Sequence, residues 1–150
     1  MNRERYLEDY TVGEIVRAET GVTLTEAEII DFAFRYDPQP IHIDKPAAEH
    51  SPYGGLIASG WQVAVVAFRT LVEAGALGRG SAGSPGADQV RWHRPVRPGD
   101  TITGEVEVTG VRDSRSKPDR GVVTMDWRVT NQRGERVMSW QGTQIVMKRQ

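Results

Sequence analysis

Apolar and polar positions follow a different pattern in the two halves of the chain. In the second half they alternate with a period of two in three segments, residues 89–93, 101–109 and 123–129, and residues 137–147 make a fourth segment with apolar residues at both ends. Such alternation is typical of antiparallel strands that bury one face and keep the other in water. We therefore expect four consecutive strands in this half, with a hairpin turn at Asn131–Gly134 between the last two.

A first helix is expected between Thr25 and Asp37. Thr25 followed by Glu28 matches a capping box, in which the two side chains satisfy backbone amides at a helix start. Proline disfavours the helical conformation of the residue before it, so Pro38 should end this helix just before Asp37. The apolar face of the helix is expected to contain Ile30, Ala33 and Phe34.

A second helix is expected from about Gly60 to Glu73, with Gly75 as a stop signal. Its apolar face leaves only a narrow polar stripe, which is typical of a largely buried helix. The residues of that face are Val65, Phe68, Leu71 and Val72. With a first strand at residues 15–20, the order of elements predicts an α+β fold, in which one antiparallel sheet is wrapped around a long central helix.

Composition supports one globular domain over residues 1–150 and excludes several functions. Hydrophobic residues make up 38% of the chain, charged residues 26%, and the net charge is −1, so neither disorder nor general attraction to nucleic acid is expected. There is no cysteine, and the three histidines lack metal-ligand spacing, so no metal site is expected. The N-terminus leads into no apolar segment, and the longest apolar run, Val63–Phe68, is too short to span a membrane. A cytoplasmic protein without membrane contact is expected.

Asp37 and His42 form the first candidate for chemistry. They are expected on a loop that Pro38 and Pro40 stiffen, because proline restricts φ. A rigid loop can present a carboxylate and an imidazole to one water molecule, and both groups can exchange protons near neutral pH. The simpler alternative is a turn with two polar residues, in which His42 bonds a backbone carbonyl. The two residues by themselves leave both interpretations open.

The stretch Phe32–Trp61 resembles the MaoC-like dehydratase family, which includes the R-specific enoyl-CoA hydratases. The resemblance lies in Asp37-Pro38-Gln39-Pro40-Ile41-His42, in the later Gly54-Gly55-Leu56-Ile57-Ala58-Ser59-Gly60, and in the blocks Arg91–Asp100 and Asn131–Gly134. It implies a hotdog fold, with Asp37 and His42 as the catalytic pair that holds the water. It also implies that the Gly60 N–H binds the thioester carbonyl, a role that suits a helix N-terminus.

The chain departs from the family pattern at three positions. Gln39 replaces the usual asparagine, Ser59 stands where relatives often have histidine, and Phe68 stands where some relatives carry serine. The residues expected to contact the substrate are Gln39, Ser59, Trp61, Phe34 and Phe68. A candidate site for coenzyme A phosphates is the cluster Arg115, Lys117 and Arg120, since arginine pairs well with phosphate. The alternative for this cluster is a solvated, salt-bridged loop.

The resemblance implies a lyase that reversibly hydrates a 2-enoyl-CoA to a 3-hydroxyacyl-CoA, with the R product. No cofactor is expected, and coenzyme A enters only as part of the substrate. Free sheet edges predict a homodimer or a larger homo-oligomer. Two alternatives remain: a hotdog acyl-CoA thioesterase, which hydrolyses the thioester, and a non-catalytic module that binds acyl thioesters.

Overall fold

The computed structural model describes residues 3–150, and Met1 and Asn2 of the N-terminal segment lie outside the described residues. Its helices are η1 (Leu7–Asp9, a 3-10 helix), α1 (Glu26–Tyr36), α2 (Pro40–Ile43), α3 (Lys45–Glu49) and α4 (Gly60–Glu73). Its strands are β1 (Ile15–Arg17), β2 (Val22–Thr23), β3 (Gly86–Trp92), β4 (Thr101–Asp113), β5 (Arg120–Thr130) and β6 (Arg136–Met147).

The strands form one six-stranded antiparallel sheet in the order β1-β4-β5-β6-β3, and β2 also pairs with β4. The predicted alternation is confirmed on β5, where Val123, Met125, Trp127 and Val129 are all buried. β3 is different. It lies at the edge of the sheet, is mostly exposed, and breaks its register with β6 between Asp88 and Arg91.

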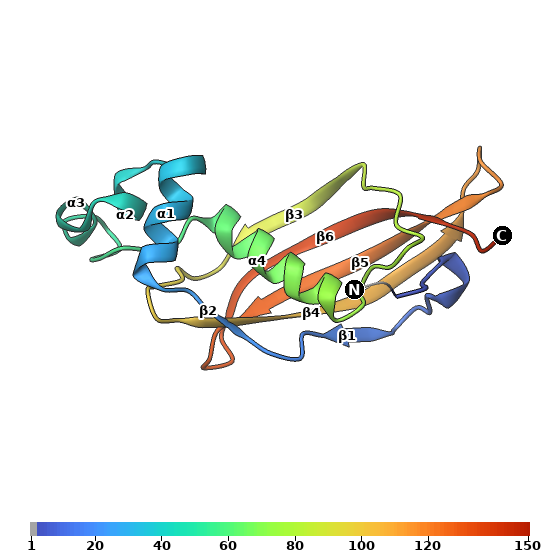
Figure 1. Cartoon of the computed structure of the whole chain (residues 1–150), viewed down its shortest axis with the longest axis horizontal. Coiled ribbons are helices and arrows are strands. Elements are labelled where there is room, and N and C mark those ends of the chain that lie inside the picture. Colours follow the sequence, from blue (N-terminus) through green and yellow to red (C-terminus); the bar gives the residue numbers. More distant parts are fainter. Residues whose placement is uncertain (1–2) are drawn as a thin grey trace.

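The long helix α4 lies across one face of this sheet, as Figure 1 shows. Its buried side is the row Val63, Ala67 and Leu71, whose spacing places the three side chains on one helix face. A Cβ atom at Gly104 of β4 would come within 2.8 Å of Leu71 Cδ1, so glycine lets the helix approach the strand closely. The α+β fold with a central helix is therefore confirmed.

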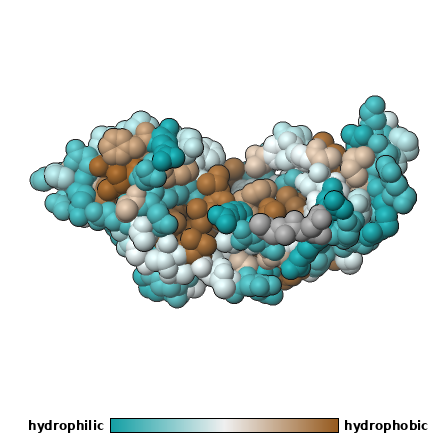
Figure 2. Space-filling model, in the orientation of Figure 1, coloured by the Kyte–Doolittle hydropathy of each residue, from teal (hydrophilic) through white to brown (hydrophobic). Residues whose placement is uncertain are grey.

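The opposite side of α4 is not buried. Trp61 and Val65 are 58% and 53% exposed and form an apolar stripe along the helix, while Phe68, on the flank of the helix toward the sheet, is 38% exposed. Apolar side chains gather along this part of the molecule in Figure 2. The prediction of a largely buried helix is therefore wrong for a single copy of the chain, because the sheet covers only one side of α4.

Three aromatic rings link α4 to the middle of the sheet. Phe68 stacks on Trp127 with ring centroids 5.3 Å apart, and Trp127 stacks on Trp140 at 5.2 Å. Such stacks stabilise a core beyond the area that they bury, by about 0.5–1.5 kcal/mol per pair. Phe68 thus belongs to the packing between helix and sheet.

Several short elements escaped the sequence analysis. The chain around His42, expected as a loop, forms the helical turn α2, and neither η1 nor β2 was expected. The first strand ends at Arg17, not at Thr20. In the part of the chain that the structure covers, no helix has the length and apolar character needed to cross a membrane.

Replacing Leu71 with alanine should lower the free energy of unfolding by about 2–5 kcal/mol, because the change leaves a cavity between α4 and the sheet. Arg69→Ala on the exposed side of the same helix is the matched control and should cost less than about 0.5 kcal/mol. Urea denaturation measures both. Equal losses in the two variants would contradict the packing described for α4.

Candidate active site

Asp37 lies at the C-terminal end of α1, as predicted. Thr25 caps the other end of the helix in the expected capping box with Glu28. The Asp37 N–H donates to the Ala33 carbonyl at 2.9 Å, and the chain then leaves the helical path before Pro38. The buried face of α1 is Ile29 and Ala33 rather than the predicted set with Ile30 and Phe34.

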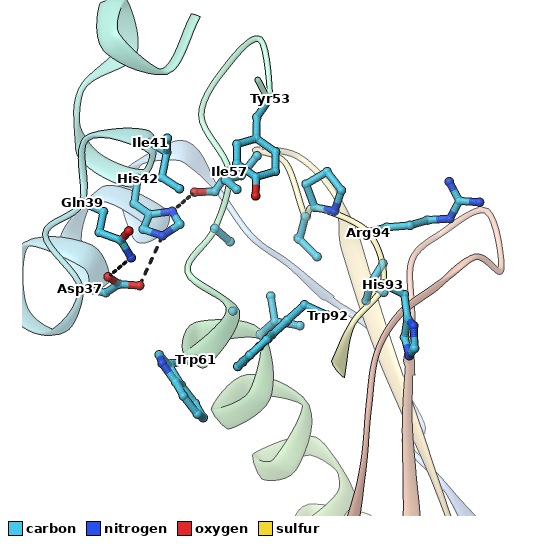
Figure 3. Close-up of a pocket in the computed structure, with 16 residues that line it drawn as sticks. Asp37, Gln39, Ile41, His42, Tyr53, Ile57, Trp61, Trp92, His93 and Arg94 are labelled. Carbon is cyan, nitrogen blue, oxygen red and sulfur yellow. Dashed lines mark hydrogen bonds and ion pairs between the residues drawn. The ribbon is translucent and has the colours of Figure 1, made fainter. Parts of the chain in front are cut away.

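His42 lies on α2, whose first residue is Pro40. Proline is favoured at this position because its fixed φ suits a helix start and because the N–H that it lacks is not needed there. The imidazole is buried, and its Nδ1 is 2.7 Å from the Ile57 carbonyl oxygen. Because a carbonyl only accepts, Nδ1 carries the proton of this bond. The other nitrogen, Nε2, lies 3.3 Å from Asp37 Oδ2, as Figure 3 shows.

Two side chains donate hydrogen bonds to the Asp37 carboxylate. Gln39 Nε2 donates to Oδ1 at 2.7 Å, and Ser59 Oγ donates to Oδ2 at 2.7 Å. Burial raises the pKa of Asp37, but the bonds from Ser59 and Gln39 and the neighbouring His42 together outweigh burial and hold that pKa below its ordinary value. The carboxylate is therefore ionised at neutral pH.

The N-terminus of α4 completes the arrangement. Ser59 is the N-cap residue, and its Oγ accepts the Trp61 N–H at 3.3 Å. The Gly60 N–H has no hydrogen-bond acceptor among residues 3–150. It lies where the helix dipole is positive, so an anionic or polarised oxygen would be stabilised there. A Cβ atom at Gly60 would overlap the Trp92 indole, so this position requires glycine.

A cavity of about 540 Å³ lies between the α1–α2 region and the end of β3, and Asp37, His42 and Gly60 border it. The aromatic side chains Tyr53, Trp61 and Trp92 line it, and Trp61 packs edge-on against Trp92 with ring centroids 5.0 Å apart. The remaining lining residues are Asp37, Gln39, Ile41, His42, Ile57, Ala58, Gly60, Val63, His93, Arg94, Pro95, Val96 and Val137. The cavity is partly open to solvent and leaves room for a small ligand next to the Asp37–His42 pair.

The structure brings most of the predicted site residues together. Asp37, Gln39, His42, Gly60 and Trp61 border the cavity. Ser59 does not border it and instead bonds Asp37. Gln39, predicted to contact substrate, likewise directs its amide to the carboxylate.

Phe34 and Phe68, predicted as pocket walls, lie outside this cavity. Phe34 points away from the buried side of α1 and is 64% exposed, while Phe68 is stacked on Trp127. Both were chosen for nearness in sequence, which says little about direction on a helix. Trp92 and Tyr53, which the sequence offers as further aromatic candidates for the pocket wall, line the cavity instead.

The predicted phosphate cluster is not part of this cavity. Arg115 and Lys117 lie in the β4–β5 hairpin, at the opposite end of the sheet from α1–α3 in Figure 1. Arg120 begins β5, and its guanidinium group donates two hydrogen bonds to the Asp119 carboxylate. In a single copy of the chain these residues are not brought to Asp37, and their phosphate role stays a prediction. Among residues 3–150 no group of three or more His, Cys, Asp or Glu side chains is arranged to hold a metal ion.

A family model described as "MaoC like domain" matches residues 8–131. The chain therefore belongs to the MaoC-like family. The structure of the MaoC-like dehydratase from Rhodospirillum rubrum is 38% identical, with a TM-score of 0.86, over 97% of this chain and 99% of that one. A protein from Archaeoglobus fulgius described as a monoamine oxidase regulatory protein is 31% identical, with a TM-score of 0.90, over 100% and 99%.

A relative with a named activity is the mesaconyl-CoA hydratase of Cereibacter sphaeroides. It is 29% identical over 99% of this chain, and the match spans 43% of that protein. The chain is thus similar to less than half of this hydratase. Together these relatives place the chain in a hotdog family that includes hydratases and dehydratases.

Replacing Gln39 with alanine should raise the pKa of Asp37, because a donor to the ionised carboxylate is lost. Gln39 is exposed, so folding should be unaffected. Carbon-13 NMR of the Asp37 carboxyl group across a pH titration measures the change. Gln141→Ala, an exposed glutamine on β6 outside the cavity, is the control. An unchanged Asp37 titration in Gln39→Ala would show that this hydrogen bond does not stabilise the carboxylate.

Proposed function

We propose that the protein is an enoyl-CoA hydratase, which reversibly adds water to a 2-enoyl thioester to form a 3-hydroxyacyl thioester. One observation carries the proposal. His42 Nε2 and Asp37 Oδ2 lie 3.3 Å apart at the cavity. The N-terminus of α4 borders the same cavity, and its Gly60 N–H has no acceptor within residues 3–150. The pair supplies acid–base groups, and the amide supplies a donor for the thioester oxygen.

His42 would carry the proton in this reaction. Its Nδ1 proton is committed to the Ile57 carbonyl, so only Nε2 is left to exchange one. A water held between Nε2 and Asp37 loses a proton to Nε2 as its oxygen bonds to the β-carbon of the substrate. The same nitrogen then returns the proton to the α-carbon, so that H and OH are added across the double bond. The Asp37 carboxylate stabilises the imidazolium in between.

The thioester oxygen would gain negative charge as the β-carbon is attacked. A hydrogen bond from the Gly60 N–H at the positive end of α4 would stabilise this charge more than the ground state, which is how such a donor accelerates a reaction. Glycine at position 60 leaves room for the Trp92 indole, which lines the cavity beside the start of α4.

The similarity to known relatives supports the type of reaction more than any particular substrate. The mesaconyl-CoA hydratase and the R. rubrum dehydratase are similar to this chain, and hydration and dehydration are one reaction in two directions. The R configuration of the product is implied by the resemblance to R-specific hydratases. A non-catalytic role stays the second candidate, because the A. fulgius relative is described as a regulatory protein.

Loss of enoyl-thioester absorbance with crotonyl-CoA and longer 2-enoyl-CoAs measures the proposed activity. Asp37→Asn and His42→Ala should each lower kcat by about 10²–10⁴-fold, because each removes part of the acid–base pair. Arg69→Ala, on the exposed side of α4, should keep wild-type kinetics.

Other results would favour the alternatives. Full hydration in both variants would exclude the assigned pair. Release of free thiol from saturated acyl-CoAs would indicate a thioesterase. Binding of acyl-CoA without turnover over the whole panel would indicate a binding module.

We also propose that a second copy of the chain covers the apolar stripe of α4. Trp61 and Val65 are more than half exposed on that helix, and Trp92 is 44% exposed on β3. β3 pairs with β6 alone among the described strands, so its other edge is free. An exposed apolar patch beside a free strand edge is typical of a self-association surface.

Light scattering after gel filtration should give at least twice the chain mass of 16.7 kDa. Val65→Glu should shift the protein to the monomer, because a charge would be buried in the interface. Phe34→Glu changes an equally exposed apolar residue on α1 and should leave the assembly intact. A wild-type protein that elutes as a monomer at micromolar concentration would overturn the dimer.

A further inference from the structure

Ser59 occupies the junction between the two arms of the site. It is completely buried and lies immediately before Gly60, and its hydroxyl group donates a hydrogen bond to Asp37 at the end of α1. We propose that Ser59 is a positioning residue that couples the N-terminus of α4 to the Asp37 carboxylate. The proposal deepens the hydratase function and rests on it, because it assigns to Ser59 the task of holding Asp37 in register with Gly60.

The hydroxyl group of Ser59 both donates and accepts a hydrogen bond. It accepts the Trp61 N–H at 3.3 Å and donates its one proton to Asp37 Oδ2 at 2.7 Å. A hydrogen-bonded relay therefore runs from the helix start to the carboxylate. Each bond in such a relay polarises the next one, so the carboxylate receives part of the positive end of the helix dipole through Ser59.

The relay divides the first amides of α4 between two tasks. The Trp61 N–H serves Asp37 through Ser59, and the Gly60 N–H stays without an acceptor among the described residues. Because the two amides are adjacent on one helix, Ser59 ties the Asp37 carboxylate directly to the helix start that carries the thioester donor. A shift of Asp37 would misplace the water relative to the bound thioester, and positioning errors of this kind lower rates strongly.

A direct role of Ser59 toward the substrate does not fit the geometry. Its side chain does not border the cavity, and it has no exposed surface. A serine nucleophile would need a base to take its proton. The acceptor here is the Asp37 carboxylate, whose lowered pKa makes it a weak base, and not an imidazole. Ser59 thus acts through Asp37.

Two substitutions separate this coupling from the capping of α4. Ser59→Gly and Ser59→Ala both remove the hydroxyl, but glycine is a tolerated N-cap residue and alanine is a poor one. The two variants should therefore raise the pKa of Asp37 by the same amount, while alanine lowers the melting temperature more. Carbon-13 NMR of Asp37 and thermal unfolding measure these effects.

Kinetics test the consequence for catalysis. With crotonyl-CoA, Ser59→Gly should lower kcat by roughly tenfold and leave KM within about twofold, because positioning of the water is lost and substrate contacts are kept. Ser114→Ala is the matched control, since Ser114 Oγ also accepts backbone amides, of Ser116 and Lys117, in the distant β4–β5 hairpin. It should change neither the Asp37 titration nor kcat.

The outcomes distinguish this proposal from the proposed function. An unchanged Asp37 titration in Ser59→Gly, or a loss that lies entirely in KM, would overturn the positioning role. A second result is that the wild-type protein hydrates none of the enoyl-CoAs while Ser59→Gly still raises the pKa of Asp37. That result would support the coupling between Ser59 and Asp37 and reject hydration as the activity.

Discussion

The packing of α4 against the sheet is the interaction on which the rest of the structure depends. Val63, Ala67 and Leu71 bury one side of the helix, and this contact fixes where the helix begins. The N-terminus of α4 is thereby held next to the segment from Asp37 to His42, which would otherwise be a polar connection between helices. Hydrophobic burial in one part of the molecule thus creates an electrostatic site in another.

The main elements of the fold could be predicted from local patterns. The capping box at Thr25 and the effect of Pro38 located the ends of α1, and period-two alternation located β4 and β5, because these features depend on neighbouring residues alone. The short turn α2 was missed because Pro40 suits a loop and a helix start equally well. The exposed side of α4 was missed because an apolar face does not reveal whether a partner covers it within the same chain.

The candidate site, like the fold, could be predicted only in part from the sequence. Asp37, His42 and Gly60 were found through a motif whose spacing is visible along the chain. The directions of Phe34 and Phe68 depend on which side of each helix meets the sheet, and this is a tertiary property. The bonds from Gln39 and Ser59 to Asp37 were equally out of reach, since donor and acceptor meet only after α1 and α4 are placed. Departures from the family pattern at these two positions now have a physical meaning: both supply donors to one carboxylate.

The bond between His42 Nδ1 and the Ile57 carbonyl has a consequence for how the site can change over time. The partner that selects the histidine tautomer is a main-chain atom, so replacement of the Ile57 side chain leaves it in place. Evolution can therefore vary residue 57 to reshape the cavity without altering the proton-carrying nitrogen. A survey of side-chain substitutions would score this position as a permissive wall and would overlook its part in the chemistry.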